Sequence, residues 1–175
     1  MTALAARDYF FEGNRWKVAY FEHLTNVTPL DRRAGFRTSL RQAEEVINSG
    51  RIVLIFPEGT RQKSGRLADF KPLVGKLALE TGTDILPLHI EGAYASMPKG
   101  AVLPKARDIT VRIGPALSID DLRDHTAEMK PSDAARHVAK LARTAVDRLS
   151  EGGVFDLARL ESEAAPFLRG APPGR

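Results

Sequence analysis

A strand that is apolar on both faces constrains this sequence more than any other feature. Residues 52–56 read IVLIF, a pattern typical of a strand in the middle of a covered, parallel sheet. Two more buried strands are predicted at 85–90 and 109–113, and the helical recurrence of apolar residues predicts helices at 33–48, 72–82 and 131–149. Helices that alternate with doubly buried strands predict an α/β fold, a layered domain with a mostly parallel sheet flanked by helices.

The loop after this strand is where we expect a site. The order strand, loop, helix, strand between residues 52 and 90 predicts a βαβ unit, so the loop from Pro57 lies at the carboxyl edge of the sheet, where open α/β sheets bind ligands. Six cations and two anions fall between residues 51 and 76, so this stretch carries the whole net charge of +4. A field of that sign favours phosphate-bearing ligands or anionic lipid, although a solvated basic face gives the same pattern.

The 175 residues are enough for one hydrophobic core. We expect the α/β domain at 1–120, a carboxyl-terminal helical region at 121–165, and a flexible tail rich in Gly and Pro at 166–175. The opening segment, 2–23, predicts one or two helices and holds six of the chain's twelve aromatic residues. These aromatic side chains either pack against a neighbour or lie at a membrane interface.

Composition and charge exclude several kinds of protein. The chain has no cysteine, which excludes disulfides, thiolate zinc sites and a cysteine nucleophile. No apolar run approaches the ~20 residues of a membrane-spanning helix, and the sequence opens without a secretory signal pattern. We therefore expect a cytoplasmic protein, or one that is peripheral at the cytoplasmic face of the membrane. We expect no nucleic-acid partner, because the positive charge is concentrated in one loop region that lacks interleaved aromatic residues.

The hexapeptide FPEGTR at 56–61 is the sharpest motif. Pro57 fixes φ where the chain leaves the strand, and Gly59 allows a sharp turn or a close approach of the backbone to a ligand. Thr60 supplies a hydroxyl donor, and Arg61 supplies a planar fork that holds two phosphate oxygens. Glu58 can orient Arg61 or accept a hydroxyl proton. For the tetrapeptide PEGT alone, a strand-to-loop turn with an incidental ion pair is the alternative.

The complete hexapeptide resembles the third conserved block of the glycerolipid acyltransferases, the group that contains the lysophosphatidate and glycerol-3-phosphate acyltransferases. Upstream, residues 29–32 (PLDR) precede a predicted helix and are similar to the second block of this family. Downstream, residues 70–75 (FKPLVG) are similar to the helix start that follows the loop, and residues 85–88 (ILPL) to the fourth block. The resemblance covers about residues 28–92.

This resemblance implies transfer of an acyl chain to a hydroxyl of a glycerol phosphate or lysophospholipid, in phospholipid biosynthesis. The donor would be a thioester of coenzyme A or of acyl carrier protein, and no metal or prosthetic cofactor is implied. An anionic membrane surface is a further expected partner. The residues assigned by the resemblance are Glu58, Gly59, Thr60, Arg61 and Arg32 for the acceptor's phosphate and glycerol, and Phe56, Pro57 and Pro87 for the shape of the site.

The family's catalytic block, a histidine followed five positions later by an aspartate, is absent. A hydroxyl attacks a thioester well only if a nearby imidazole takes its proton and a carboxylate holds that ring. The residues five positions after His23, His89, His125 and His137 are Thr28, Tyr94, Lys130 and Ala142, and none of them is an aspartate. The place of the block would fall just before Met1, so we expect an amino-terminally incomplete form of the enzyme. The alternative is a non-catalytic module that binds phosphate or lysophospholipid.

The four histidines are expected in different surroundings. His89 alternates with apolar residues and is expected as a partly buried strand residue. His125 and His137 lie far along the chain from the motif and are expected at the surface. His23, near the second block, is the one candidate for a substitute base.

Overall fold

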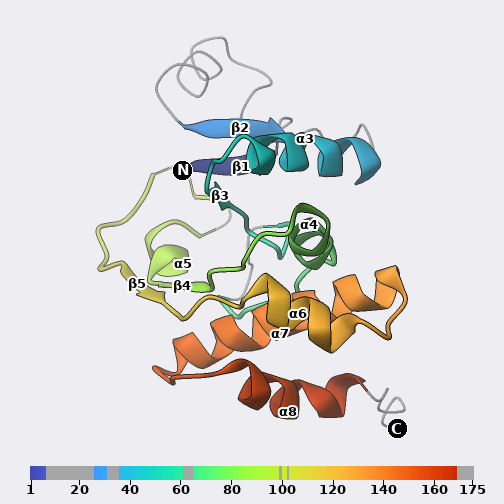
Figure 1. Cartoon of the computed structure of the whole chain (residues 1–175). Coiled ribbons are helices and arrows are strands. Elements are labelled where there is room, and N and C mark those ends of the chain that lie inside the picture. Colours follow the sequence, from blue (N-terminus) through green and yellow to red (C-terminus); the bar gives the residue numbers. More distant parts are fainter. Residues whose placement is uncertain (7–25, 31–35, 61–64, 99, 102, 169–175) are drawn as a thin grey trace, which may run out of the picture. The chain divides into compact units, whose positions relative to one another are not determined.

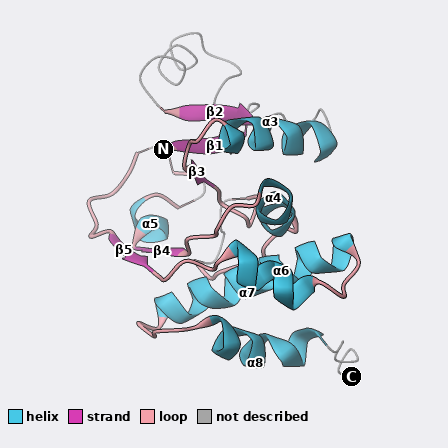
Figure 2. Ribbon diagram, viewed as in Figure 1, coloured by secondary structure: helices cyan, strands magenta, loops and turns pink. Residues whose placement is uncertain are grey.

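The computed structural model describes residues 1–6, 26–30, 36–60, 65–98, 100–101 and 103–168 (Figure 1). The chain divides into two compact units, Met1–Phe56 and Pro57–Arg175, which are described one at a time. Helices and strands occur in both units (Figure 2). Within the described ranges, no helix is both long enough and apolar enough to cross a bilayer.

The first unit contains a parallel three-stranded sheet in the order β2-β1-β3. Its strands are β1 (Thr2–Ala6), β2 (Val27–Leu30) and β3 (Val53–Leu54), with Ala3 opposite Val27 and Thr2 opposite Val53. This sheet and the helices of the structure confirm the predicted α/β class with a parallel sheet.

Strand β1 corrects the prediction that the chain opens with a helix. Neighbouring residues of β1 bond to opposite partners: the Thr2 amide donates to the Ile52 carbonyl (2.8 Å) and the Ala3 amide to the Asn26 carbonyl (3.1 Å). The buried Thr2 hydroxyl also donates to the Asn26 carbonyl at 3.0 Å. Pairing on both sides overrides the helical preference of the alanines. The aromatic residues between 9 and 21 lie outside the described part of the chain.

Strand β3 differs from its prediction in length and place. Residues 52–56 were expected to form a strand in the middle of the sheet, but the strand extends only over Val53–Leu54, and β1 takes the middle position. Helix α3 (Phe36–Asn48) precedes it and confirms the helix predicted at 33–48 over its described part. Leu40 and Ala43 are buried on α3. The chain leaves the helix through Gly50, whose φ of 78° is favourable only for glycine.

The second unit is mainly helical, with one antiparallel strand pair. Its helices are α4 (Leu73–Thr81), α5 (Ala93–Ser96), α6 (Ile119–Thr126), α7 (Pro131–Ser150) and α8 (Leu157–Leu168), and its strands are β4 (Leu88–Glu91) and β5 (Thr110–Ile113). The predicted helices at 72–82 and 131–149 are confirmed as α4 and α7. The strand pair places His89 opposite Arg112, and Ile90 opposite Val111.

Two features of the strand pair differ from the prediction. The strands at 85–90 and 109–113 were expected to be buried, but Ile90, Val111 and Ile113 are more than a third exposed. The predicted βαβ unit would join residues 52–56 to 85–90 in one sheet. In the structure β4 pairs with β5, and β3 belongs to the other unit, so no described pairing joins the two segments.

Helix α7 forms the centre of the second unit. Its predicted apolar face is confirmed, because Ala134, Val138, Leu141, Ala145 and Leu149 are all buried. Helix α4 approaches it so closely at Gly75 that a Cβ there would lie 2.2 Å from the Ala135 carbonyl oxygen. Leu122 of α6 and Leu160 of α8 complete the core. The division predicted at residue 120 stays a prediction, although α4 and α7 lie in the same compact unit.

Helix α8 corrects the expected start of the tail. A flexible tail was predicted from residue 166, but the helix continues to Leu168. Leu160 and Ala164 are buried in the core that α8 shares with α7, and this packing stabilises the helix. Residues 169–175 lie outside the described part of the chain.

Candidate functional site

Two hydrogen bonds close the loop that begins at Pro57. The Lys71 amide donates to the Pro57 carbonyl (2.8 Å), and the Ala68 amide donates to Oε2 of Glu58 (2.8 Å). Glu58 is half-buried, and its carboxylate is held by the returning limb of its own loop. These two hydrogen bonds tie the start of the loop, where the predicted phosphate-binding residues begin, to its returning limb.

Gly59 is required by the backbone of this loop. Its φ is 75°, in the left-handed region where a side chain costs free energy. A Cβ at this position would meet only the Lys71 side chain, at an ordinary contact distance of 3.7 Å. The conformation, rather than a lack of space, thus explains why glycine stands here.

The structure describes part of the predicted site. Glu58, Gly59 and Thr60 follow one another at the start of the loop, with Thr60 exposed. Pro87 is buried, and its carbonyl accepts a hydrogen bond from the Gly114 amide (3.0 Å), which ties the approach to β4 to the end of β5. Phe56 ends the first unit. Arg61 and Arg32 lie outside the described residues, so their roles stay predictions.

His89 and His125 lie as predicted. His89 is a half-buried residue of β4. His125 is exposed near the end of α6, where its Nδ1 lies 2.6 Å from the Asp121 carbonyl oxygen. His23 is outside the described part of the chain.

His137 corrects the prediction of a surface histidine, since it is 5% exposed on α7. Its Nε2 lies 3.7 Å from Oε1 of Glu161, and Nε2 of His125 lies 3.1 Å from the other oxygen of the same carboxylate. Burial lowers the pKa of His137, and Glu161 opposes this effect. The sequence spacing could have predicted this burial, because residue 137 lies three positions after Ala134 and four before Leu141, on the buried face of the helix.

A cavity of about 360 Å³ adjoins the far limb of the loop. Its lining comes from three elements: Gly65, Arg66 and Leu67 of the loop, His89 of β4, and Arg143, Asp147 and Ser150 of α7. The contribution of α7 was missed from sequence. The i, i+4 and i+3 spacing of its three polar residues was the available signal.

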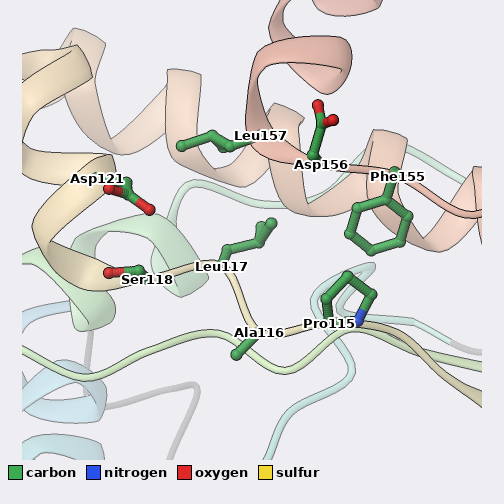
Figure 3. Close-up of a pocket in the computed structure, with 8 residues that line it drawn as sticks. All are labelled: Pro115, Ala116, Leu117, Ser118, Asp121, Phe155, Asp156 and Leu157. Atoms are coloured by element: carbon green, nitrogen blue, oxygen red, sulfur yellow. The ribbon is translucent and has the colours of Figure 1, made fainter.

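A second cavity, of about 200 Å³, lies where α6 and α8 begin (Figure 3). Leu117, Phe155 and Leu157 give it an apolar wall, and Asp121 and Asp156 supply carboxylates. No cation is among its lining residues, so it does not suit a phosphate group. Within the described ranges, no cluster of three His, Asp or Glu side chains is arranged to hold a metal ion.

The chain is an α/β protein. Its hexapeptide motif at 56–61 opens a loop in which Gly59 has a left-handed backbone conformation. A model of the family described as Acyltransferase matches residues 3–91, which is just over half of the chain. The chain belongs to this acyltransferase family.

Two similar relatives carry the name 1-acyl-sn-glycerol-3-phosphate acyltransferase. The protein from Limnanthes douglasii is 37% identical over 84 residues, which are 47% of this chain and 30% of the relative. The protein from Borreliella burgdorferi is 29% identical over 103 residues, 59% of this chain and 41% of the relative. The chain thus spans well under half the length of these relatives.

A solved structure shares the fold. It is the 1-acyl-sn-glycerophosphate (LPA) acyltransferase PlsC from Thermotoga maritima, with a TM-score of 0.58 and 22% sequence identity. The match covers 85% of this chain and 56% of that one. At this identity the likeness supports the fold assignment and nothing finer.

Proposed function

We propose that this chain is the acceptor-binding part of a lysophosphatidate acyltransferase of phospholipid biosynthesis. The reaction moves an acyl chain from a thioester of coenzyme A or acyl carrier protein to a free hydroxyl of a 1-acyl-glycerol 3-phosphate. The hydroxyl oxygen forms the new ester bond, the thiolate leaves, and the hydroxyl proton must pass to a base. The names of the relatives support 1-acyl-glycerol 3-phosphate as the acceptor in this proposal.

The closed loop after Pro57 is the observation that carries this proposal. The Ala68 amide bonds to the Glu58 carboxylate and Gly59 makes a left-handed turn, so the backbone that leads to Thr60 is defined. Arg61 then offers its fork to two phosphate oxygens, and Arg32 assists it. Phe56, Pro57 and Pro87 shape the surroundings in this proposal.

A second candidate, a non-catalytic binding module, is favoured by one observation. No histidine of the sequence is followed five positions later by an aspartate. His137 does not replace that pair, because its ring is buried among helices rather than placed on the motif loop. Under both candidates this chain binds lysophosphatidate. Under the first, turnover appears when an in-frame upstream segment with the histidine and aspartate is present.

The test combines binding and turnover on the purified chain. We expect lysophosphatidate to bind, and acyl transfer from acyl-coenzyme A or acyl carrier protein to be undetectable. A longer form that carries the upstream block should turn over, and a histidine-to-alanine change in that block should abolish turnover but keep binding. Absence of lysophosphatidate binding by the purified chain would contradict both candidates.

The substrate class also supports a place for the protein at an anionic membrane surface on the cytoplasmic side. The basic stretch at 51–76 supplies the attraction, which falls with salt. Flotation with vesicles containing phosphatidylglycerol should carry the chain upward at low salt, whereas neutral phosphatidylcholine vesicles should not. Equal flotation with both lipids, or with neither, would overturn the electrostatic attachment.

A further inference from the structure

The returning limb of the motif loop, residues 68–71, runs along helix α7 before it leads into α4. Near the start of the limb, Oδ1 of Asp69 lies 3.5 Å from Nε of Arg143. Further along, in α4, a Cβ on Gly75 would lie 2.2 Å from the Ala135 carbonyl oxygen. The partner on α7 thus moves back from residue 143 to residue 135 as the chain advances from residue 69 to residue 75. The segment therefore follows α7 in the opposite direction, with a contact near each end.

Phe70 anchors this limb in the hydrophobic core. Its side chain is half-buried and packs against the core cluster. Burial of apolar area is the main stabilising contribution of an aromatic side chain in such a place. The members of the cluster that come from α7 are Val138, Leu141, Ala142, Ala145 and Leu149. Phe70 therefore ties the limb to the core that is built around α7.

Two cations of α7 act on Asp69, the residue before Phe70. The Nε of Arg143 is buried and forms the ion pair with Asp69. Burial lowers the pKa of Lys140, and the charge of Asp69 opposes this shift. A terminal nitrogen of Arg143 also lies 3.8 Å from Oδ2 of Asp147, within α7 itself. Because the Asp69 carboxylate is fully exposed, solvent screens its ion pair, which makes it a weaker contact than the packing of Phe70.

The same limb closes the start of the motif loop. The Ala68 amide donates to Oε2 of Glu58, and the Lys71 amide donates to the Pro57 carbonyl, both at 2.8 Å. These two donors stand on either side of residues 69 and 70, which contact α7 and the core. A shift of the limb along α7 therefore moves both donors away from their acceptors.

We propose that helix α7 positions the motif loop through this limb, with Phe70 and Arg143 as positioning residues of the acceptor site. The inference rests on the proposed function, because it gives that site a support from α7, which lies beyond the matched residues 3–91. Neither side chain contacts the acceptor in this arrangement. Phe70 and the ion pair of Arg143 set the place of the limb, and its two amides transmit that place to the start of the loop.

The first test is amide hydrogen exchange of the purified chain, measured by NMR, together with a calorimetric titration of lysophosphatidate. Phe70→Ala should accelerate exchange of the Ala68 and Lys71 amides by about tenfold or more, since a large packed side chain is lost. It should also weaken lysophosphatidate binding, and Phe70→Leu should restore most of both properties. The matched control is Leu79→Ala, which removes a side chain that packs against the same core from α4 and should leave the two amides unchanged.

A second, milder variant keeps the test decisive if Phe70→Ala unfolds. Arg143→Gln should accelerate exchange of the two limb amides by about two- to fivefold, as the loss of a solvent-screened ion pair predicts. Addition of Asp69→Asn to this variant should have little further effect, because the pair is already broken. The control is Arg136→Gln, an exposed arginine of α7 whose ion pair is with Asp133. Unchanged exchange of the limb amides in Arg143→Gln would overturn its positioning role.

The remaining outcomes separate this inference from general stability and from the proposed function. Equal acceleration of the limb amides and of the Leu141 amide in the core of α7 would mean a general loss of stability, and would overturn the inference. Faster exchange of the limb amides in Phe70→Ala with unchanged lysophosphatidate affinity would also overturn it, because the site would not need this support. No binding of lysophosphatidate by the wild-type chain overturns the proposed function instead.

Discussion

At the residue scale, the left-handed conformation of Gly59 links the backbone to the proposed phosphate site. Gly59→Ala should destabilise the chain by about 1–2 kcal/mol, the cost of a side chain in this region. It should also weaken lysophosphatidate binding, because relaxation of the turn redirects Thr60 and Arg61. Urea unfolding and a lipid titration give the two readouts.

Gly152→Ala is the matched control for that substitution. Gly152 has a φ of 73° and open space around its Cβ position, so the free energy of unfolding should fall by a similar amount. Gly152 follows α7, away from the motif loop, so lipid binding should be kept. Equal losses of binding in the two variants would contradict the role given to Gly59.

His137 makes stability depend on pH. Burial lowers its pKa below the ordinary 6.5, so the folded chain favours the neutral ring. Its stabilising contribution is complete above pH 6.5 and is lost as the pH falls through the lowered pKa. His137→Leu should therefore lose less stability than wild type between pH 7.5 and pH 5, by urea unfolding. Parallel pH profiles for the two proteins would contradict a lowered pKa of His137, because they would mean that Glu161 cancels the effect of burial.

At the element scale, helices could be predicted from sequence and strand partners could not. The apolar period of α7 and the left-handed glycines after α3 and α4 are local signals, and all three helices are confirmed. Strand β1 carries no local signal of comparable strength, since its place between β2 and β3 depends on residues 24 and 51 positions away. His137 was predicted at the surface because it lies far along the chain from the motif, although its helical spacing indicated the buried face.

The contact between α4 and α7 gives a prediction about packing. Gly75→Ala forces a Cβ against the Ala135 carbonyl, so the helices must separate, at a cost of roughly 1–3 kcal/mol. Lys76→Ala, one residue further on α4, removes an exposed ion pair with Glu80 and should change stability by less than about 0.5 kcal/mol. Thermal or urea unfolding compares them. Similar effects of the two substitutions would contradict the close crossing.

At the scale of the whole molecule, the candidate site was partly predictable. The hexapeptide identified the family, and the structure closes its loop through Glu58. The cavity lined by α7 was not predicted. A motif is recognised from neighbouring residues, whereas the α7 residues of the cavity lie 75 or more positions after its loop residues. The described cavity therefore joins residues of the motif loop to residues of the helical region.

The most direct measurement is a calorimetric titration of lysophosphatidate into the wild-type chain, Arg61→Ala and Arg66→Ala. The account predicts binding by wild type, a loss of about tenfold or more for Arg61→Ala, since a phosphate contact is removed, and a much smaller loss for Arg66→Ala. Equal losses in the two variants, or no binding by the wild-type chain, would contradict the claim that the motif loop holds the acceptor's phosphate.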